Sequence, residues 1–501
     1  MLVRALRQPV RQAQMHRLGF STHTAWRQAS PLNSHLPSSS YQVVVIGGGS
    51  GGLAVSATLA SRLGKGNVAV VEPSDTHYYQ PLWTFVGGGL KDFDQSCLPM
   101  RDVIPDKADW LQTRVAQVLP ESNQVLLASG QTVSYQYLVV AAGIQTNWQK
   151  IKGLDESLLG THGIASNYSA TGVSHTYPLL QQVAQQAATA TSSSASPRQL
   201  LFTMPSTPIK CAGAPQKIMY LADEILCREG ANRNAYRIDY FTGIGKIFAI
   251  QKYADKLLAI CRDRGLNLHY HYDLTEIRPF QRQAVFTRNA TAPATTNGPL
   301  PSPIPTETLP TRAQVQSEGN DHQITVDYDF IHVTPPMSAP DFLRKTPALV
   351  NAGGWVDVDA KTLQHVRFPN VFSLGDCSSL PTSKTAAAAA AESWVVKENL
   401  LHLIRHHDST SALPAQYDGY TSCPLVTGKN KLVLAEFNGY EGTPLETLPF
   451  NQAQESNSAY QLTAHVIPQI YWQGMVRGMW HGPSTIRSAF KPVAAMTKSS
   501  D

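Results

Sequence analysis

Two cysteines offer the most reactive chemistry in this sequence of 501 residues. Cys211 follows Lys210 and precedes Pro215, a residue type that suits the first turn of a helix. The positive end of a helix and nearby lysines, here Lys210 and Lys217, lower the pKa of a thiol and favour the reactive thiolate. Cys423 lies in a segment that we expect to be a loop, where catalytic residues are often found.

The other four cysteines have weaker settings. We expect Cys227, Cys261 and Cys377 to be small buried apolar residues, and Cys97 is a poor candidate for a third redox position. No pair forms a C-x-x-C motif, so the sequence supports neither a zinc ribbon nor a thioredoxin-like site, and no metal site is predicted.

A glycine-rich loop, Gly47-x-Gly49-x-x-Gly52, lies between a predicted buried strand, Tyr41–Ile46, and a predicted helix, Leu53–Leu63. Gly47 permits the tight turn, Gly49 lets a pyrophosphate approach the backbone, and Gly52 packs the helix against the strand. Free amides at the start of the helix bind phosphate. The loop therefore predicts a dinucleotide site, but it does not separate FAD from NAD.

Two acidic residues extend this motif. Glu72 lies 20 residues beyond Gly52, after a predicted strand, and should bind ribose hydroxyls. A second predicted strand, Val371–Leu374, ends in Gly-Asp at Asp376, and a helix begins near Thr385. This resembles the second FAD motif of flavoproteins with two dinucleotide-binding domains, in which the aspartate binds the ribityl chain. The positive end of the helix would favour the anionic reduced flavin.

A second doubly wound α/β unit is predicted after residue 150 by alternating strands and helices. A nicotinamide-using flavoprotein needs another glycine-rich loop after the strand Gln199–Met204, but the sequence there is Pro205-Ser206-Thr207-Pro208. Proline lacks an amide donor. NAD(P)H is therefore not expected as the electron donor.

The N-terminal 40 residues carry five arginines and no acidic residue, a pattern typical of a mitochondrial transit peptide. A disordered basic tail is the alternative. The rest of the chain is nearly neutral, so nucleic acid is not an expected partner. Residues 187–197 and 289–320 are predicted to be solvated polar insertions.

The C-terminal segment 456–476 carries no formal charge and combines apolar with aromatic residues. Pro468 argues against a membrane-spanning helix. Basic residues follow, and this combination predicts a helix that lies on an anionic membrane surface. The alternative is that the apolar face packs in the core or in a dimer contact. The basic residues are Arg477, Arg487, Lys491 and Lys498.

Five segments, in order along residues 41–490, resemble the mitochondrial sulfide:quinone oxidoreductases. They are Lys210-Cys211-Ala212-Gly213-Ala214-Pro215-Gln216-Lys217, Val333-Thr334-Pro335-Pro336-Met337, Gly375-Asp376-Cys377, Pro381-Thr382-Ser383-Lys384-Thr385-Ala386, and Thr421-Ser422-Cys423-Pro424-Leu425-Val426-Thr427-Gly428. The resemblance implies FAD, two redox cysteines, a quinone acceptor, and a peripheral or monotopic place on the matrix side of the mitochondrial inner membrane.

The resemblance makes Cys211 and Cys423 the redox pair, bridged through sulfur. Hydrosulfide would attack this bridge and leave a persulfide, expected on Cys211, and a thiolate on Cys423 facing the flavin. Electrons would pass through FAD to ubiquinone, and a small acceptor such as glutathione or sulfite would remove the sulfane sulfur. The expected FAD contacts are Gly47, Gly49, Ser50, Gly51, Gly52, Glu72, Gln80, Val115, Asp376, Ala386, Ala387, Ala388 and Ala389.

The expected fold is α/β, with two Rossmann-like dinucleotide-binding domains of the flavoprotein disulfide reductase type and a C-terminal membrane-associating region. We expect a transit peptide at 1–40, an FAD-binding domain in two parts at 41–150 and 346–405, a second Rossmann-like domain at 151–345, and a C-terminal region at 406–501. One alternative function is that of a type II NADH:quinone dehydrogenase, against which the missing second glycine loop argues. Another is a non-catalytic flavin-binding signalling protein, which would not need both cysteine motifs.

Overall fold

The structure, a computed structural model, describes residues 40–189, 196–289, 309–310, 312–318, 321–406 and 412–489. The expected transit peptide lies outside the described residues except for Ser40. Parts of both expected polar insertions, and the basic residues Lys491 and Lys498, also lie outside them.

The first sheet carries the glycine-rich loop. β1 (Ser40–Ile46) is a buried β-branched run, and it pairs in parallel with β2 (Val68–Val71) and β8 (Thr132–Val140). β20 (Val371–Ser373) joins the other side of β8, so a strand from late in the chain completes this sheet. The remaining strands of the sheet are β5 (Asp109–Leu111), β6 (Val115–Leu119) and β7 (Gln124–Leu127).

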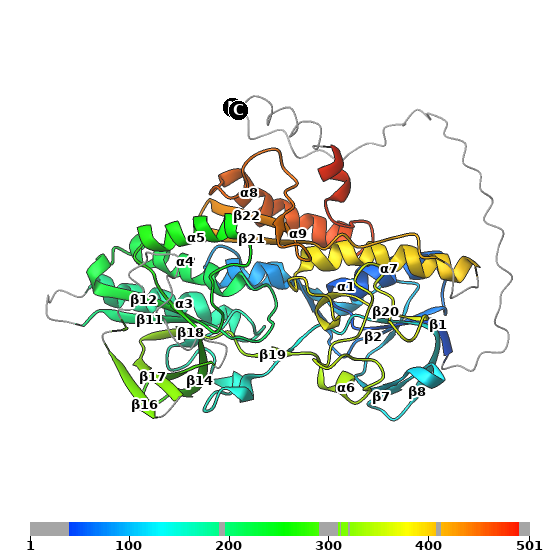
Figure 1. The fold of residues 1–501 in the computed structure, drawn as a ribbon, viewed down its shortest axis with the longest axis horizontal. Coiled ribbons are helices and arrows are strands. Elements are labelled where there is room, and N and C mark those ends of the chain that lie inside the picture. The colour runs from blue at the N-terminus through cyan, green and yellow to red at the C-terminus, as the bar shows by residue number, and fades with distance from the viewer. Residues whose placement is uncertain are drawn as a thin grey trace. The chain divides into compact units, whose positions relative to one another are not determined.

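Two long helices pack against one another beside this sheet (Figure 1). α1 (Ser50–Leu63) begins directly after the glycine-rich loop, and α7 (Ala386–His406) begins one residue after the predicted start near Thr385. Both helices therefore direct their N-terminal ends toward the region where a dinucleotide is expected. Short elements nearby are β3 (Thr76–Tyr78), β4 (Cys97–Pro99), α2 (Trp83–Gly87) and α6 (Asp341–Arg344).

The second domain has a parallel five-stranded sheet in the order β10-β18-β11-β12-β13. Its strands are β10 (Ile164–Ala165), β11 (Arg198–Met204), β12 (Tyr236–Thr242), β13 (Asn267–Tyr270) and β18 (Phe330–His332). Its helices are α3 (Val173–Ala188), α4 (Ala214–Arg228) and α5 (Gln251–Asp263).

A four-stranded antiparallel sheet contains β14 (Tyr272–Arg278), β15 (Gln283–Arg288), β16 (Ala313–Glu318) and β17 (Asp321–Asp327). A two-stranded antiparallel pair, β9 (Gln145–Thr146) and β19 (Met337–Ser338), lies where the chain passes between the domains. Two Rossmann-like units of this kind are the fold that the sequence predicted.

The C-terminal region forms a layer over α4 and α5 on one side and over α1 and α7 on the other (Figure 1). It contains an antiparallel sheet of β21 (Tyr420–Gly428), β22 (Lys431–Asn438) and β23 (Thr443–Pro444). The helical segments α8 (Asn457–Gln461), η9 (Leu462–Val466), α9 (Ile467–Ile470) and η10 (Tyr471–Met475) follow, and η9 and η10 are π-helical.

Much of the expected membrane-facing side of this segment is packed inside the protein. Tyr471, Met475 and Val476 are buried, and Arg487 is also buried and pairs with Asp418. The structure thus corrects the expectation that these side chains lie on a membrane. No helix among the described residues is long and apolar enough to cross a bilayer.

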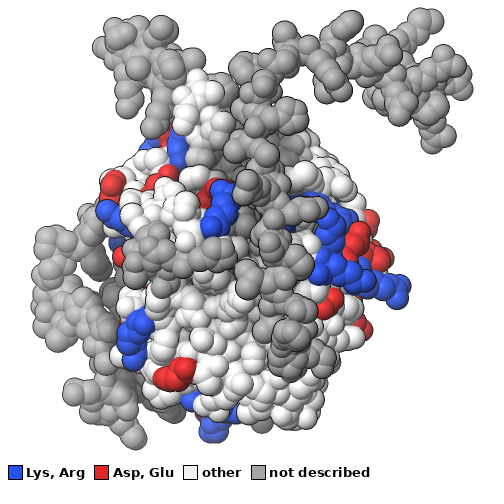
Figure 2. Space-filling model, turned by 90° about the vertical axis from the view of Figure 1, so that its right-hand side faces the viewer, with Lys and Arg blue, Asp and Glu red and all other residues white. Residues whose placement is uncertain are grey.

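Charged residues are interspersed on the face shown in Figure 2, which looks at the molecule from the right-hand side of Figure 1. Lysine and arginine lie beside aspartate and glutamate, and uncharged residues cover most of the visible described surface. Several lysine and arginine side chains gather toward the right-hand edge of this view, with acidic side chains beside them.

Candidate functional site

A cavity of about 640 Å³ connects the two predicted motifs with the cysteine region and the C-terminal layer. Most of the predicted site residues line it: Gly47, Gly49, Ser50, Gly51, Glu72, Gln80, Cys211, Asp376, Ala386, Ala387 and Ala389. Four predicted site residues are not part of this lining: Gly52, Val115, Ala388 and Cys423. Val115 begins β6 of the first sheet, whereas Ala388 is a buried residue of α7 between the lining residues Ala387 and Ala389.

The glycine-rich loop has the geometry that a pyrophosphate requires. Gly47 has φ +102°, a left-handed conformation that favours glycine, and a Cβ there would lie 2.4 Å from the carbonyl oxygen of Ala141. A Cβ on Gly52 would lie 1.9 Å from the carbonyl oxygen of Gly47, so this position packs the helix against the turn. No atom lies within 4 Å of a Cβ built on Gly49, which leaves space for a ligand to approach the backbone.

Glu72 fixes the shape of this loop. One carboxylate oxygen accepts a hydrogen bond from the amide of Gly48 at 2.7 Å, and the other accepts one from the amide of Ser74 at 2.8 Å. Because Glu72 ends β2 and also lines the cavity, it joins the second strand to the glycine-rich loop at the expected ribose position.

Asp376 lies where β20 ends and before α7 begins. Burial raises the pKa of Asp376, while the positive charges of Lys384 and Lys210 oppose that effect. The ammonium group of Lys210 donates a hydrogen bond to the side-chain oxygen of Gln80 at 2.9 Å. The predicted FAD contacts Asp376 and Gln80 therefore lie on one cavity wall with two lysines.

The sulfurs of Cys211 and Cys423 lie 3.0 Å apart, although 212 residues separate them in the sequence. This is longer than a disulfide bond of about 2.05 Å, so the thiols are in contact but unbonded. Cys211 has φ +48°, and its amide donates to the carbonyl oxygen of Lys384 at 2.8 Å. Gly213 permits the close approach, because a Cβ there would lie 2.5 Å from the sulfur of Cys423.

The two thiols have opposite tendencies to ionise. The hydrogen bond with Cys423 lowers the pKa of Cys211, and the ammonium group of Lys217, 3.5 Å from the Cys211 sulfur, lowers it further against the effect of burial. The same hydrogen bond and burial raise the pKa of Cys423. The pair therefore favours a thiolate at Cys211, which the Cys423 thiol and Lys217 stabilise.

Cys423 lies inside strand β21, so the expectation that it stands in a loop is wrong. Successive side chains of a strand point to opposite faces. Ser422 and Pro424 line the cavity, whereas Cys423 faces the start of α4 and packs against Gly213. The partners of Ser422 and Pro424 on β22, which are Glu436 and Leu434, also line the cavity. Cys423 therefore lies on the side of β21 opposite to Ser422 and Pro424, which face an apolar compartment of the same cavity.

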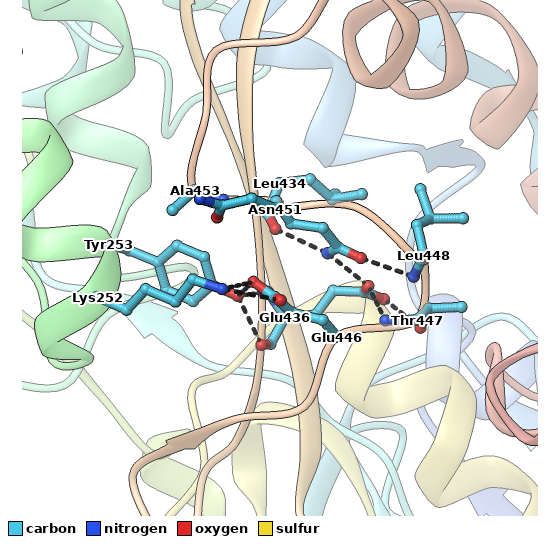
Figure 3. Close-up of polar contacts among 10 residues, drawn as sticks. Lys252, Tyr253, Leu434, Glu436, Glu446, Thr447, Leu448, Asn451 and Ala453 are labelled. Carbon is cyan, nitrogen blue, oxygen red and sulfur yellow. Dashed lines mark hydrogen bonds and ion pairs between the residues drawn. The ribbon is translucent and has the colours of Figure 1, made fainter. Parts of the chain in front are cut away.

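The carboxylate of Glu436 holds the wall of this compartment together (Figure 3). It accepts hydrogen bonds from the hydroxyl of Tyr420, the amide and hydroxyl of Thr447, and the side-chain amide of Gln452, at 2.5–2.9 Å. Four donors occupy the lone-pair positions of the carboxylate. Glu436 therefore shapes the wall and has little capacity left for a ligand.

The other cysteines lie apart from this pair in the fold. Cys227 is exposed on α4, Cys261 is buried on α5, and Cys377 is buried just after β20. Cys97 begins β4 and is half-buried. The expectation of a buried residue is thus wrong for Cys227, which lies on the exposed side of α4.

Sequence reasoning missed several residues that line the cavity, among them His77, Tyr168, Glu436 and Tyr471. None belongs to a recognisable motif. His77 and Tyr471 meet only because the C-terminal segment folds back over the glycine-rich loop, and no local signal in the sequence indicates that contact.

Fold and site together define a flavoprotein oxidoreductase with two dinucleotide-binding domains. Residues 41–175 match the family model of the pyridine nucleotide-disulphide oxidoreductases. A mitochondrial sulfide:quinone oxidoreductase of Mus musculus is 42% identical over 93% of this chain and 94% of its own length. The corresponding protein of Dictyostelium discoideum is 38% identical over 90% of this chain and 89% of its own. The chain belongs to the mitochondrial sulfide:quinone oxidoreductase family.

A solved structure agrees with this fold. The sulfide:quinone oxidoreductase of Aquifex aeolicus superposes with a TM-score of 0.67, over 90% of this chain and 95% of that one, at 16% identity. The family's cofactor is FAD, and the residues here fit it, because the open backbone at Gly49 and the acidic residue Asp376 line one continuous cavity.

Proposed function

We propose that the chain oxidises hydrogen sulfide at the Cys211–Cys423 pair and reduces ubiquinone, with FAD as the carrier of two electrons between them. The observation that carries this proposal is the 3.0 Å contact between the two sulfurs, one of which lines the cavity that holds both dinucleotide motifs. In the oxidised resting enzyme the two cysteines are joined through sulfur.

Hydrosulfide begins the cycle by attacking this bridge. One new S–S bond forms and one breaks, which leaves a persulfide on one cysteine and a thiolate on the other. Lys217 lies beside the sulfurs as a buried cation and offsets the negative charge that enters the site. A small nucleophile such as glutathione or sulfite then removes the sulfane sulfur, which leaves both cysteines reduced. FAD held by the glycine-rich loop and Asp376 would supply the two-electron acceptor that the pair needs to form its bridge again.

The second domain supports sulfide rather than NAD(P)H as the donor. The turn after β11 contains Pro205 and Pro208, which have no amide hydrogen to offer a phosphate. The amide of Ser206 in the same turn already donates to the carboxylate of Asp273 at 2.7 Å. A negative carboxylate at this position would also repel a nucleotide phosphate.

Ubiquinone is proposed to bind in the apolar compartment behind the β21–β22 hairpin. The wall there consists largely of aliphatic side chains from the C-terminal layer, as a quinone ring and its isoprenoid chain require. The principal side chains are Pro424, Leu434, Leu448, Leu462, Ile467 and Ile470. This arrangement would keep sulfide chemistry and quinone reduction on opposite sides of β21.

The FAD contacts are proposed to be the residues predicted from the sequence, with a division of roles. Residues that line the cavity would touch the cofactor, whereas Gly52, Val115 and Ala388 would act by supporting the loop, the sheet and the helix. We also propose the domain boundaries 41–150, 151–345, 346–405 and 406–501. The pairing of β20 with β8 supports the assignment of two separate segments to the FAD-binding domain.

The proposed location is the matrix face of the mitochondrial inner membrane. The family's mitochondrial relatives and the arginine-rich first 40 residues support a mitochondrial address. Exposed apolar side chains of the C-terminal layer, namely Val466, Met479 and Ile486, support peripheral contact with a lipid surface.

An anaerobic stopped-flow experiment tests the proposed donor. Sulfide should bleach the flavin absorbance of the purified protein rapidly, ubiquinone should then restore it, and NADH and NADPH should leave it unchanged. Rapid bleaching by NADH but not by sulfide would overturn the proposal in favour of a type II NADH:quinone dehydrogenase. Bound flavin that no donor reduces would favour a non-catalytic flavin protein.

A further inference from the structure

The glycine-rich loop is hydrogen-bonded directly to the C-terminal segment through Tyr471. The hydroxyl of Tyr471 lies 2.7 Å from the hydroxyl of Ser50 and 2.6 Å from Nε2 of His77. Nδ1 of the same imidazole lies 2.9 Å from the carbonyl oxygen of Gly48. Ser50 begins α1 and Gly48 lies in the loop, so one tyrosine 421 residues away contacts the loop directly and through His77.

The direction of these hydrogen bonds follows from the groups present. Burial lowers the pKa of His77 to about 4, so the imidazole is neutral near pH 7. A carbonyl oxygen only accepts, so Nδ1 carries the proton and donates to Gly48. Nε2 is then an acceptor and accepts a hydrogen bond from the hydroxyl of Tyr471. The oxygen of Tyr471 in turn accepts from the hydroxyl of Ser50.

The side chains of His77 and Tyr471 are withdrawn from water. His77 is 2% exposed and Tyr471 is 3% exposed, and both side chains line the cavity near the glycine-rich loop. The ring of Tyr471 also packs against that of Tyr79 with a centroid distance of 4.2 Å. Hydrogen bonds in such a place hold their partners in one geometry, because the unpaired state costs the full desolvation of each group.

The same segment is anchored a second time, away from the cavity. The carbonyl oxygen of Gly478 accepts from the hydroxyl of Thr58 on α1 and from the ammonium group of Lys397 on α7, each at 3.1 Å. Lys397 also donates to Nδ1 of His481 at 2.9 Å. The C-terminal segment thus rests on both helices whose N-terminal ends face the cavity.

We propose that Tyr471 is a positioning residue for the pyrophosphate of FAD, and that docking of segment 457–481 and binding of FAD stabilise one another. The inference rests on the proposed function, which assigns the pyrophosphate to the loop Gly47–Gly52. Tyr471 holds the hydroxyl of Ser50 and, through His77, the backbone of Gly48 in the arrangement that receives the phosphates. Such coupling is reciprocal, so a looser segment releases FAD faster and loss of FAD loosens the segment.

Tyr471→Phe tests the proposal on the purified holoenzyme, because it removes only the hydroxyl. The rate of FAD release, followed as the return of free-flavin fluorescence after dilution, should rise about tenfold, as expected for loss of a buried hydrogen-bonded group. Hydrogen exchange should be faster in both segment 457–481 and residues 47–52. A role confined to packing would leave both measurements unchanged.

Tyr460→Phe is the matched control, since Tyr460 lies in the same segment but is not part of the cavity lining. Its ring packs against that of Phe85 with a centroid distance of 5.8 Å. Its FAD release should equal that of the wild type. Lys397→Met should loosen segment 457–481 without touching the cavity and should also speed FAD release. The coupling would be overturned if Tyr471→Phe released FAD at the wild-type rate. It would also be overturned if Lys397→Met showed faster hydrogen exchange in segment 457–481 but no faster release of FAD.

The sulfide half-reaction separates this inference from the proposed function. Tyr471→Phe kept saturated with FAD should still be bleached by sulfide, because the cysteine pair is intact. Failure of sulfide to bleach the FAD-saturated wild type would refute the proposed function and would leave the measured effect of Tyr471 on FAD release to stand by itself.

Discussion

Cys211 and Cys423 have different surroundings although their sulfurs are in contact. Cys211 lines the cavity, whereas Cys423 is 2% exposed and faces α4. Replacing either with serine removes the electrophilic bridge, so sulfide should bleach the flavin at least about 100-fold more slowly, as for the loss of a nucleophilic group. FAD content should remain normal. Cys227 is an exposed cysteine on the same helix as Lys217, and Cys227→Ser should keep wild-type turnover. Full activity in both Cys211→Ser and Cys423→Ser would contradict the assignment of the redox pair.

Lys217 should set the pH range in which Cys211 reacts. Its ammonium group and the Cys423 thiol both lower the pKa of Cys211. Lys217→Met removes one of these causes, so the Cys211 thiolate should form only at higher pH. The alkylation rates of wild type and variant should agree well below the wild-type pKa and well above the pKa of the variant, and should differ between these two values. Alkylation of the reduced enzyme by iodoacetamide across pH measures this shift. Lys217→Arg keeps the charge and should titrate close to the wild type, and an unshifted profile in Lys217→Met would exclude the electrostatic role.

Single residues were predictable from the sequence where a motif fixes the backbone around them. Gly47 and Glu72 belong to a local strand–turn–helix pattern, and Asp376 belongs to a strand end followed by a helix. His77 and Tyr471 were not predictable, because their hydrogen bond joins positions 394 residues apart and depends on tertiary packing alone.

At the scale of elements, Cys423 was expected in a loop but lies in strand β21. Proline removes a donor from a strand, and Pro424 follows Cys423 directly. β21 is the edge strand of its sheet, in the order β21-β22-β23, and an edge strand tolerates proline because one side of its backbone needs no partner within the sheet. Edge position is a property of the assembled sheet, so the sequence around Cys423 could not indicate it.

The β21–β22 hairpin and the loop after it should depend on Glu436 for their stability. Glu436→Leu would leave the hydroxyl of Tyr420, both donors of Thr447 and the amide of Gln452 without a partner, at a cost of about 3 kcal/mol or more. Thermal melting should begin at a lower temperature, and the KM for ubiquinone should rise because the wall of the apolar compartment loosens.

Glu446 provides the control for this element, since it lies in the same region of Figure 3. Its carboxylate pairs with the partly exposed Lys252 at 2.8 Å, and such a pair contributes only about 0–1 kcal/mol. Glu446→Gln should therefore leave the KM for ubiquinone close to that of the wild type. Equal effects of the two substitutions would show that the Glu436 network has no special role in the wall.

For the whole molecule, the sequence predicted the two Rossmann-like units but not how the C-terminal layer joins them. Alternation of strands and helices indicates each unit by itself, because the central strands β1 and β11 are largely buried, apolar runs. The C-terminal segment has apolar residues on more than one side. Its composition could not decide which of them would pack against α1 and α7 and which would remain exposed.

Membrane attachment should depend on the few apolar side chains that the fold leaves outside. Val466, Met479 and Ile486 are 47%, 68% and 40% exposed, whereas their neighbours Tyr471 and Met475 are buried. Deleting the whole segment would therefore also remove the hydrogen bonds to the glycine-rich loop. Replacing the three exposed residues together with serine should reduce flotation with anionic liposomes while FAD content stays normal, because each buried apolar side chain contributes roughly 1.5–3 kcal/mol to membrane binding.

Phe280 gives the matched control for this membrane prediction. It is 83% exposed and lies between β14 and β15, outside the C-terminal layer. Phe280→Ser also removes a large exposed apolar side chain and should leave flotation unchanged. Added salt should weaken the flotation of the wild type, since Arg477 is exposed beside the three residues and would be attracted to anionic lipids. Unchanged flotation of the triple variant would mean that these three side chains do not hold the protein on the membrane.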